Sequence, residues 1–299
     1  MQTLSKKLLN PTTRKIVIPG PDDLNIPSND LGDYAILLMG AKGVGKTTAT
    51  ASWPDNLNFQ WEPWRANVSL RMIGADDGII VRTAQQIMDG AEDPWLLFID
   101  YTAAAMEDDT IKSFAWDSVD LAYQACFESI CARKGVTHPT QVEKDYGNTW
   151  NDIKNEFTAL ISTIRAGGKG IVFISHVKER EQEYTEGTTA LEMIGPSCTP
   201  ACLKIMKDVC SFWLYYGWKD GQRTVWCRDP DRFIDVSCGT GFINKKGELL
   251  NSFHIPANKP KLFYPTLNHA FKTGEPCLPI SNNSIKTNKK KASKKKSSK

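Results

Sequence analysis

Nine consecutive residues have the types and the spacing needed to hold a phosphate chain. Segment 40–48 reads Gly-Ala-Lys-Gly-Val-Gly-Lys-Thr-Thr and matches the P-loop motif at its fixed positions. Glycines let successive backbone N–H groups converge on phosphate oxygens, a lysine adds a mobile positive charge, and a threonine hydroxyl can hold Mg²⁺. We therefore predict nucleotide contacts from Gly40, Ala41, Lys42, Gly43, Val44, Gly45, Lys46, Thr47 and Thr48.

The elements on either side of this segment suit a phosphate-binding loop. Residues 33–39 include a short apolar run of the kind found in buried parallel strands, and residues 46–52 can form a short helix. The alternative interpretation is a glycine-rich turn that contains a lysine with no role. A strand before the motif and a helix after it favour the phosphate-binding interpretation.

Three further predicted strands are followed by polar residues. They cover 57–61, 94–99 and 170–175, and the residues that follow them are Glu62, Asp100 and His176 in turn. The run that ends at Asp100 has the form of a Walker B strand, whose carboxylate orients the water shell of Mg²⁺ beside the P-loop. We therefore predict that Thr47 and Asp100 are the Mg²⁺ ligands.

The remaining pattern predicts an α/β fold with a mostly parallel sheet, flanked by helices. Helical periodicity appears in two stripes, from Trp116 to Ile130 and from Trp150 to Ile164. Two apolar runs around the turn at 219–221 predict an antiparallel edge. We expect an irregular arm over 1–32, the core over 33–240, an extension packed on the core over 241–284 and a disordered tail over 285–299.

Composition places the chain among ordinary globular proteins. It has 299 residues, of which 41% are hydrophobic and 24% charged, without an apolar run long enough to span a membrane. The polar first residues lack the apolar region of a signal peptide, so we expect a cytoplasmic protein without membrane contact. Eight cysteines include no Cys-x-x-Cys pair, which favours small core residues over a zinc site.

The charge is divided between two unlike parts. The formal net charge is +3, but the last fourteen residues carry eight lysines and no acids, which leaves −5 for residues 1–285. We expect a basic tail with almost no apolar residues to bury to be disordered and to attract nucleic acid, although a solubility or targeting tail has the same composition. The candidate tail contacts are Lys289, Lys290, Lys291, Lys294, Lys295 and Lys296.

Over residues 34–228 the sequence resembles the phage-encoded RecA-like P-loop ATPases that accompany single-strand annealing and recombination. The resemblance rests on five segments. The first three are the first strand and P-loop (36–48), a Trp-Pro-Asp link (53–55) and a second strand that ends in an acid (57–62). The other two are the strand 96–100 and the segment 170–176, which is followed by Lys-Glu-Arg at 178–180. The chain departs from the family at 60–62, which read Gln-Trp-Glu where an Asp-x-Glu pattern is usual.

This resemblance implies roles for individual residues. Lys46, Thr47 and Asp100 would bind MgATP, Glu62 would align the attacking water, and His176 would sense the γ-phosphate. The loop after His176, with Lys178 and Arg180, would contact DNA. RecA-like proteins place ATP between subunits, so the resemblance also implies a homo-oligomer, single-stranded DNA as a ligand, and a phage annealing or single-strand-binding protein as a partner. No arginine finger can be assigned, although Arg180 and Arg228 are candidates.

Three functional hypotheses follow. The first is a DNA-stimulated ATPase of phage-type recombination, single-strand annealing or repair. The second is a small-molecule P-loop kinase, which would need an arginine-rich lid. The third is a nucleotide-gated binding or loading module with little turnover. An ATPase assay with and without single-stranded DNA separates them most directly, and the sequence favours the first.

Overall fold

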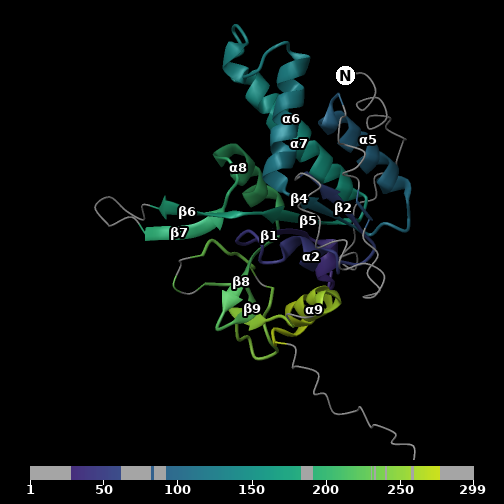
Figure 1. Ribbon diagram of the computed structural model, residues 1–299. Helices are drawn as coiled ribbons and strands as arrows, with labels where there is room; N and C mark the ends of the chain where they lie inside the picture. Colours follow the sequence, from purple (N-terminus) through teal and green to yellow (C-terminus); the bar gives the residue numbers. More distant parts are fainter. Residues whose placement is uncertain are drawn as a thin grey trace, which may run out of the picture.

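The computed structural model describes residues 28–61, 82–83, 92–182, 191–229 and, with short gaps, 231–276. Within these residues the chain forms an eight-stranded sheet and a separate two-stranded hairpin. Helices cover both faces of the large sheet (Figure 1). The strand order is β10-β9-β8-β1-β5-β4-β2-β3. The predicted fold class, an α/β fold with a mostly parallel sheet and an antiparallel edge, is confirmed.

Six neighbouring strands of the large sheet pair in parallel, and two strands at one edge are joined to them by antiparallel pairing. The parallel strands are β1 (Ala35–Met39), β2 (Asn56–Gln60), β3 (Arg82–Thr83), β4 (Ser113–Asp117), β5 (Gly170–Ser175) and β8 (Phe212–Lys219). The edge strands are β9 (Gln222–Trp226) and β10 (Ser252–His254). β8 turns into β9 through Asp220 and Gly221, both at positive φ, as a two-residue hairpin turn requires.

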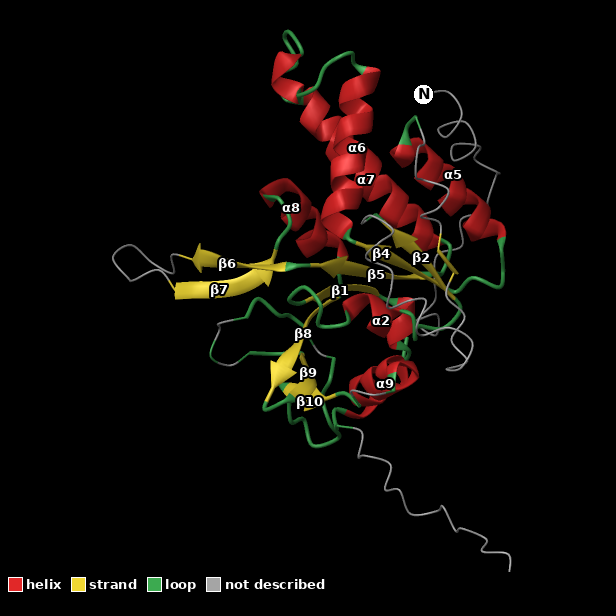
Figure 2. Cartoon of the chain, viewed as in Figure 1, coloured by secondary structure: helices red, strands yellow, loops and turns green. Residues whose placement is uncertain are grey.

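The helices divide between the two faces of the sheet (Figure 2). One face carries α5 (Pro94–Glu107), α6 (Val119–Arg133), α7 (Asn148–Ala166) and α8 (Pro200–Val209). The other carries α2 (Lys46–Thr50) and α9 (Phe263–Thr273). Short 3-10 helices are η1 (Leu31–Asp33), η4 (Pro139–Gln141) and η5 (Pro260–Leu262). No described helix is long and apolar enough to cross a membrane.

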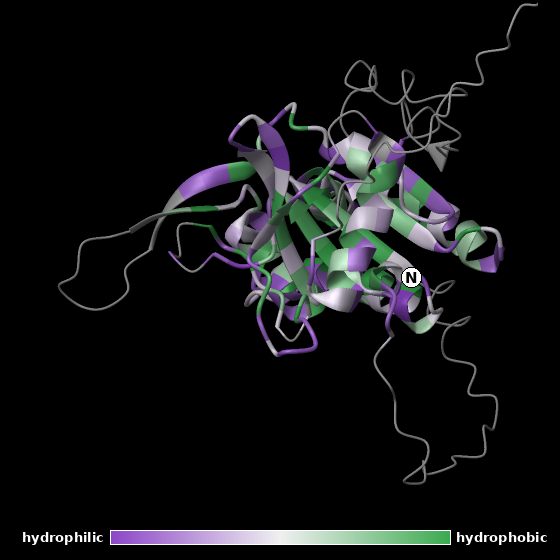
Figure 3. Ribbon diagram, turned by 90° about the horizontal axis from the view of Figure 1, so that it is seen from below, coloured by the Kyte–Doolittle hydropathy of each residue, from purple (hydrophilic) through white to green (hydrophobic). Residues whose placement is uncertain are grey.

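Each face of the sheet has its own hydrophobic cluster because side chains alternate along a strand. In β1, Ala35 and Leu37 join the cluster beneath α5 to α8, whereas Ile36 and Leu38 join the cluster that contains α9. All five residues of β1 are buried. Figure 3 shows the apolar strands at the centre of the molecule, with hydrophilic residues concentrated toward the outside. The two clusters therefore hold the P-loop strand from both sides.

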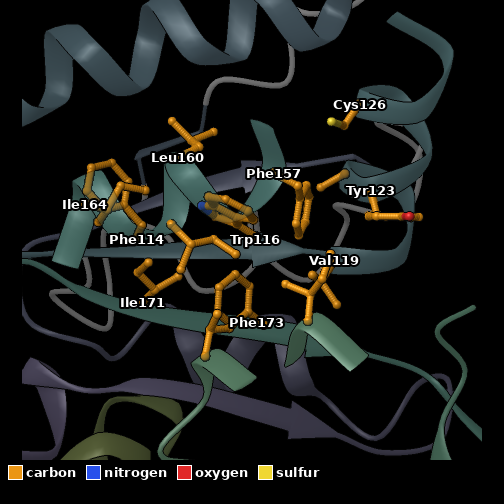
Figure 4. Packing of buried hydrophobic residues seen from close by; sticks show 14 of the residues in the cluster. Phe114, Trp116, Val119, Tyr123, Cys126, Phe157, Leu160, Ile164, Ile171 and Phe173 are labelled. Atoms are coloured by element: carbon orange, nitrogen blue, oxygen red, sulfur yellow. The ribbon is translucent and has the colours of Figure 1, made fainter. Parts of the chain in front are cut away.

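Trp116 lies at the centre of the larger cluster (Figure 4). Its ring makes edge-on contacts with Phe98, Phe157 and Phe173, at centroid distances of 4.9, 5.7 and 5.1 Å. The sequence pattern placed Trp116 on a helical stripe, and this part of the prediction is wrong. Trp116 belongs to β4, and α6 begins three residues later at Val119.

The predicted strand over 94–100 is also wrong, because this segment opens helix α5. The Asp93 carboxylate caps the helix by accepting hydrogen bonds from the N–H groups of Trp95 and Leu96 at 3.0 and 3.1 Å. Pro94 stands at the first helical position, where its missing N–H costs nothing. The buried residues of α5 follow helical spacing: Trp95, Phe98, Ile99, Thr102 and Ala105. Asp100 is exposed.

The cysteines are core residues, as predicted. Six of the seven that the structure describes are buried, and Cys210 is half-buried. Burial raises the pKa of the Cys126 and Cys210 thiols, so both remain protonated at neutral pH.

Arg228, a candidate for the arginine finger, is hydrogen-bonded to a loop of its own chain. Its guanidinium donates hydrogen bonds to the carbonyl oxygens of Gly239 and Gly241 at 2.8 and 2.6 Å.

Asp30 joins the start of the described chain to α9. Its carboxylate accepts hydrogen bonds from the Tyr264 hydroxyl, from Gly32 N at 2.9 Å and from Asn268 Nδ2 at 3.1 Å. Burial alone would raise the pKa of Asp30, but these hydrogen bonds outweigh it and hold the pKa below its ordinary value of 3.8. A lowered pKa in the folded state stabilises the fold above the unfolded-state pKa.

We therefore expect Asp30 to contribute to acid stability. The contribution is fully present above the unfolded-state pKa and is lost as the pH falls through the lower folded-state pKa. Asp30→Asn should reduce the free energy of unfolding at pH 7 and make its decline below about pH 4 shallower. Urea titrations between pH 2.5 and 7 measure both effects. An unchanged acid slope in Asp30→Asn would contradict this assignment.

Candidate nucleotide-binding site

The P-loop connects β1 to α2 at the carboxyl end of the parallel strands. Gly43 and Gly45 have φ angles of +79° and +98°, and α2 begins directly after Gly45. A β-carbon at position 40 would lie 2.2 Å from the Tyr216 carbonyl oxygen, so only glycine fits beside β8. Val44 is buried and anchors the loop to the core, whereas Ala41, Lys42 and Gly43 are exposed.

The structure brings Lys46 and His176 together. Lys46 is 5% exposed, and its Nζ donates to the carbonyl oxygens of Gly40 at 2.8 Å and Ala41 at 3.0 Å. His176 follows β5, the neighbour of β1 in the sheet, and its Nδ1 lies 3.3 Å from Lys46 Nζ. The Lys46 ammonium therefore lies beneath the loop, in contact with the His176 ring. A phosphate chain bound in the loop would be within its reach.

The acid beside the P-loop is Asp117, which the sequence analysis missed. Asp117 ends β4, is 4% exposed, and accepts a hydrogen bond from Thr47 Oγ1 at 2.5 Å through its Oδ2. The same oxygen accepts from Gln60 Nε2 at 3.0 Å. Gln60 ends β2, the strand next to β4. Two strand ends and the start of α2 thus meet at one carboxylate, which is the arrangement expected of a Walker B acid.

Asp100 does not have this position, and its assignment as an Mg²⁺ ligand is corrected. It lies on the exposed side of α5, a helix that packs on the sheet rather than forming part of it. Two signals in the sequence could have identified the right acid. Asp93-Pro94 is a helix start, and Phe-Ala-Trp-Asp over 114–117 is an apolar run closed by an acid. The second signal was missed because the sequence analysis assigned Trp116 to a helical stripe.

The other predicted site residues have different outcomes. Glu62 and the tail lysines lie outside the described residues, and Trp61 is the last described position after β2. Lys178 is exposed on β6 (Val177–Gln182), which pairs with β7 (Leu191–Pro196). Arg180 lies on the same strand. Asp120, missed by the sequence analysis, accepts a hydrogen bond from Ser197 Oγ at 3.2 Å.

The oxygen donors at this site fit Mg²⁺. The ion prefers hydroxyl, carboxylate and water oxygens, and Thr47 and Asp117 place a hydroxyl and a carboxylate in direct contact at the P-loop. Those two residues would hold the ion, which when bound neutralises charge on the phosphates. Gln60 fixes the Asp117 carboxylate from the neighbouring strand, and Lys46 would supply positive charge to a bound phosphate chain.

The fold and this site define a P-loop ATPase. The strand before the P-loop, β1, and the strand that carries the acid, β4, are separated by one strand, β5, in a mostly parallel sheet. Residues 33–234 match the AAA domain family, and the chain belongs to that family. Among solved structures it is similar to a KaiC-like protein from the hyperthermophilic archaeon Pyrococcus horikoshii OT3. The identity is 14% over 70% of this chain and 84% of that chain, with a TM-score of 0.36. No curated protein sequence matches the chain.

Proposed function

We propose that this protein is a DNA-stimulated, Mg²⁺-dependent ATPase that acts in recombination, single-strand annealing or repair, with the β6–β7 hairpin as its DNA-contacting element. The observation that carries the proposal is the attachment of this hairpin to the nucleotide site. β6 begins at Val177, immediately after His176, whose ring lies 3.3 Å from Lys46 Nζ. A change in the position of Lys46 therefore acts directly on the base of the hairpin.

The returning strand is attached to the same site. Ser197 follows β7, and its N–H donates to the His176 carbonyl oxygen at 2.8 Å. Its hydroxyl donates to Asp120, which lies three residues beyond Asp117. Both ends of the hairpin are thus tied to residues of the nucleotide site. In Figure 1 the hairpin extends away from the large sheet, where a long ligand can reach it.

The residue pattern along β6 supports a charged ligand. Lys178 and Arg180 alternate with Glu179 and Glu181, and alternation assigns residues of a strand to opposite faces. Lys178 and Glu179, the two of these residues whose side chains the structure describes, are both exposed. We propose that a polyanion binds at the part of β6 that carries Lys178 and Arg180, and that the lysines of the tail add nonspecific attraction.

The test is ATP turnover, measured with and without an oligodeoxythymidylate across a salt series. We expect the oligonucleotide to raise turnover, and this stimulation to fall as the salt concentration rises because backbone contacts release counterions. Glu62→Ala should abolish hydrolysis and retain ATP binding. Absence of DNA binding at low salt would exclude the proposal. Negligible turnover that Glu62→Ala leaves unchanged would support a nucleotide-gated module, and phosphate transfer to a nucleoside monophosphate would support a kinase.

The hairpin assignment has its own variants. Replacing Lys178 and Arg180 together by alanine should weaken DNA binding and reduce the salt slope by about 0.7 for each phosphate that the variant no longer neutralises. Replacing Lys154 and Lys204 together by alanine is the matched control, because both are exposed lysines, on α7 and α8, and this variant also removes two positive charges. Equal effects of the hairpin and control variants would show that overall charge, and not the hairpin, attracts DNA. We propose a homo-oligomer and a phage annealing or single-strand-binding partner as the setting for this activity.

A further inference from the structure

An arginine from the antiparallel edge of the sheet packs against the P-loop. Arg223 lies on β9, and a β-carbon at Gly45 would lie 3.4 Å from its Nη2, 3.5 Å from its Cζ and 3.7 Å from its Nη1. All three atoms are at van der Waals distance, so the guanidinium faces the loop backbone. Gly45 directly precedes Lys46, the residue that reaches the β- and γ-phosphates in this motif. Both terminal nitrogens of the guanidinium therefore lie beside the loop that would hold a phosphate chain.

Two aromatic residues of β8 orient this guanidinium. Trp218 is the direct cross-strand partner of Arg223, and the Arg223 Cζ lies 5.3 Å from the centroid of its ring. The Tyr216 hydroxyl is hydrogen-bonded to Arg223. Tyr216 is itself 2% exposed and packs edge-on against Phe263 at 5.0 Å. The guanidinium is therefore held between a rigid phenol and an indole ring.

The strand that carries these aromatic residues is fixed to the P-loop. β8 pairs with β1 in parallel, and the Tyr216 carbonyl oxygen lies so close to the backbone of Gly40 that a side chain at position 40 has no room. The β8–β9 hairpin is thus positioned by the loop itself. Because the strand pairing is intramolecular, this arginine is supplied by the same chain as the P-loop and needs no second subunit.

We propose that Arg223 is a phosphate-binding residue of the nucleotide site, supplied in cis, and that Trp218 positions it. The planar guanidinium presents a fork of N–H donors that matches phosphate oxygens, whereas Lys46 supplies a single point charge. Together they would contact the phosphate chain from two directions. Arg223 would contact the phosphates beyond the α-phosphate, because Gly45 precedes Lys46, and the lysine of this motif reaches the β- and γ-phosphates. The inference rests on the nucleotide binding that the proposed function requires.

Trp218 is 56% exposed, which is unusual for the largest apolar side chain. A tryptophan ring that faces an arginine holds the guanidinium through a cation–π contact with the ring face. This contact uses none of the guanidinium N–H donors as hydrogen bonds. Trp218 is therefore a positioning residue, and it also reports on Arg223 through its fluorescence.

The test compares ATP and AMP binding by calorimetry in the full chain. Arg223→Ala should weaken ATP binding by about 10- to 100-fold, the range expected for losing a hydrogen-bonded charge, and should weaken AMP binding far less. The ATP affinity of Arg223→Lys should lie between those of the wild type and of Arg223→Ala, because lysine keeps the charge but lacks the forked N–H donors. Lys219→Ala, which removes an exposed cation from the same hairpin, is the control and should change ATP affinity less than about twofold.

Fluorescence provides a second readout that a purely structural role would not change. ATP binding should alter the emission of the wild-type protein, and Trp218→Phe should remove that change. Equal losses for ATP and AMP, or equal effects of Arg223→Ala and Lys219→Ala, would overturn the inference. Melting temperatures identify a variant that has failed to fold, in which case Arg223→Lys decides. If the wild-type chain itself binds no ATP, the proposed function fails; if only Arg223 proves dispensable, this inference alone fails.

Discussion

Asp117→Asn is expected to reduce ATP hydrolysis by at least about a hundredfold, the range found when one electrostatic contact that stabilises a transition state is removed. The carboxylate is 4% exposed and is held by Thr47 at 2.5 Å and by Gln60 at 3.0 Å. Asparagine keeps the shape but removes the negative charge that a divalent ion at Thr47 requires. The measurement is phosphate release at saturating ATP and Mg²⁺, with nucleotide affinity determined in parallel.

Asp100→Asn is the matched control for this experiment. It makes the same chemical change on the exposed side of α5, and it is the acid that the sequence pattern alone selects. We expect it to leave hydrolysis within about twofold of the wild type, as for most exposed substitutions away from a site. A larger loss in Asp100→Asn than in Asp117→Asn would reverse the assignment of the Walker B acid.

Trp116→Ala is expected to lower the free energy of unfolding by about 3–5 kcal/mol, the usual cost of truncating a buried aromatic residue. Trp116 is 0% exposed and contacts aromatic rings from α5, α7 and β5. Removing the indole leaves a cavity where these elements meet, and the surrounding helices can collapse into it only in part. Urea denaturation measures the loss, and a chain with a smaller total stability would not fold.

Two further variants calibrate this loss. Trp116→Phe keeps a ring in the core and should cost less, because only part of the volume is removed. Trp150→Ala removes the same side chain from a position that is 39% exposed on α7 and should cost less than Trp116→Ala. If Trp150→Ala were the more damaging of the two, Trp116 would not be the centre of the core.

The local sequence was sufficient to predict the P-loop and the strand before it. Segment 40–48 is contiguous, and its glycines are required by the backbone itself: positions 43 and 45 have positive φ, and position 40 touches β8. The buried strands β1 and β5 were predicted for a similar reason. β1 is a fully apolar run, and β5 is an apolar run that ends at Ser175.

The apolar pattern alone does not identify the Walker B acid, because two segments share that pattern. Residues 94–100 and 113–117 are both apolar runs closed by aspartate. A cap at Asp93 converts the first into a helix, and pairing with β2 and β5 makes the second a strand. Short apolar runs are ambiguous in this way, so the choice between the two structures needs the helix-start signal at Asp93-Pro94 or the tertiary pairing of the strands.

The sequence by itself thus predicted a phosphate-binding loop over residues 40–48, because every group needed for the loop is adjacent in the chain. Tertiary structure alone decided which side chains surround that loop. Asp117, His176 and Arg223 are distant from Lys46 in sequence, and each reaches the P-loop because its strand takes a defined place in the sheet. Strand order is a property of the whole packed sheet, so no local pattern encodes it.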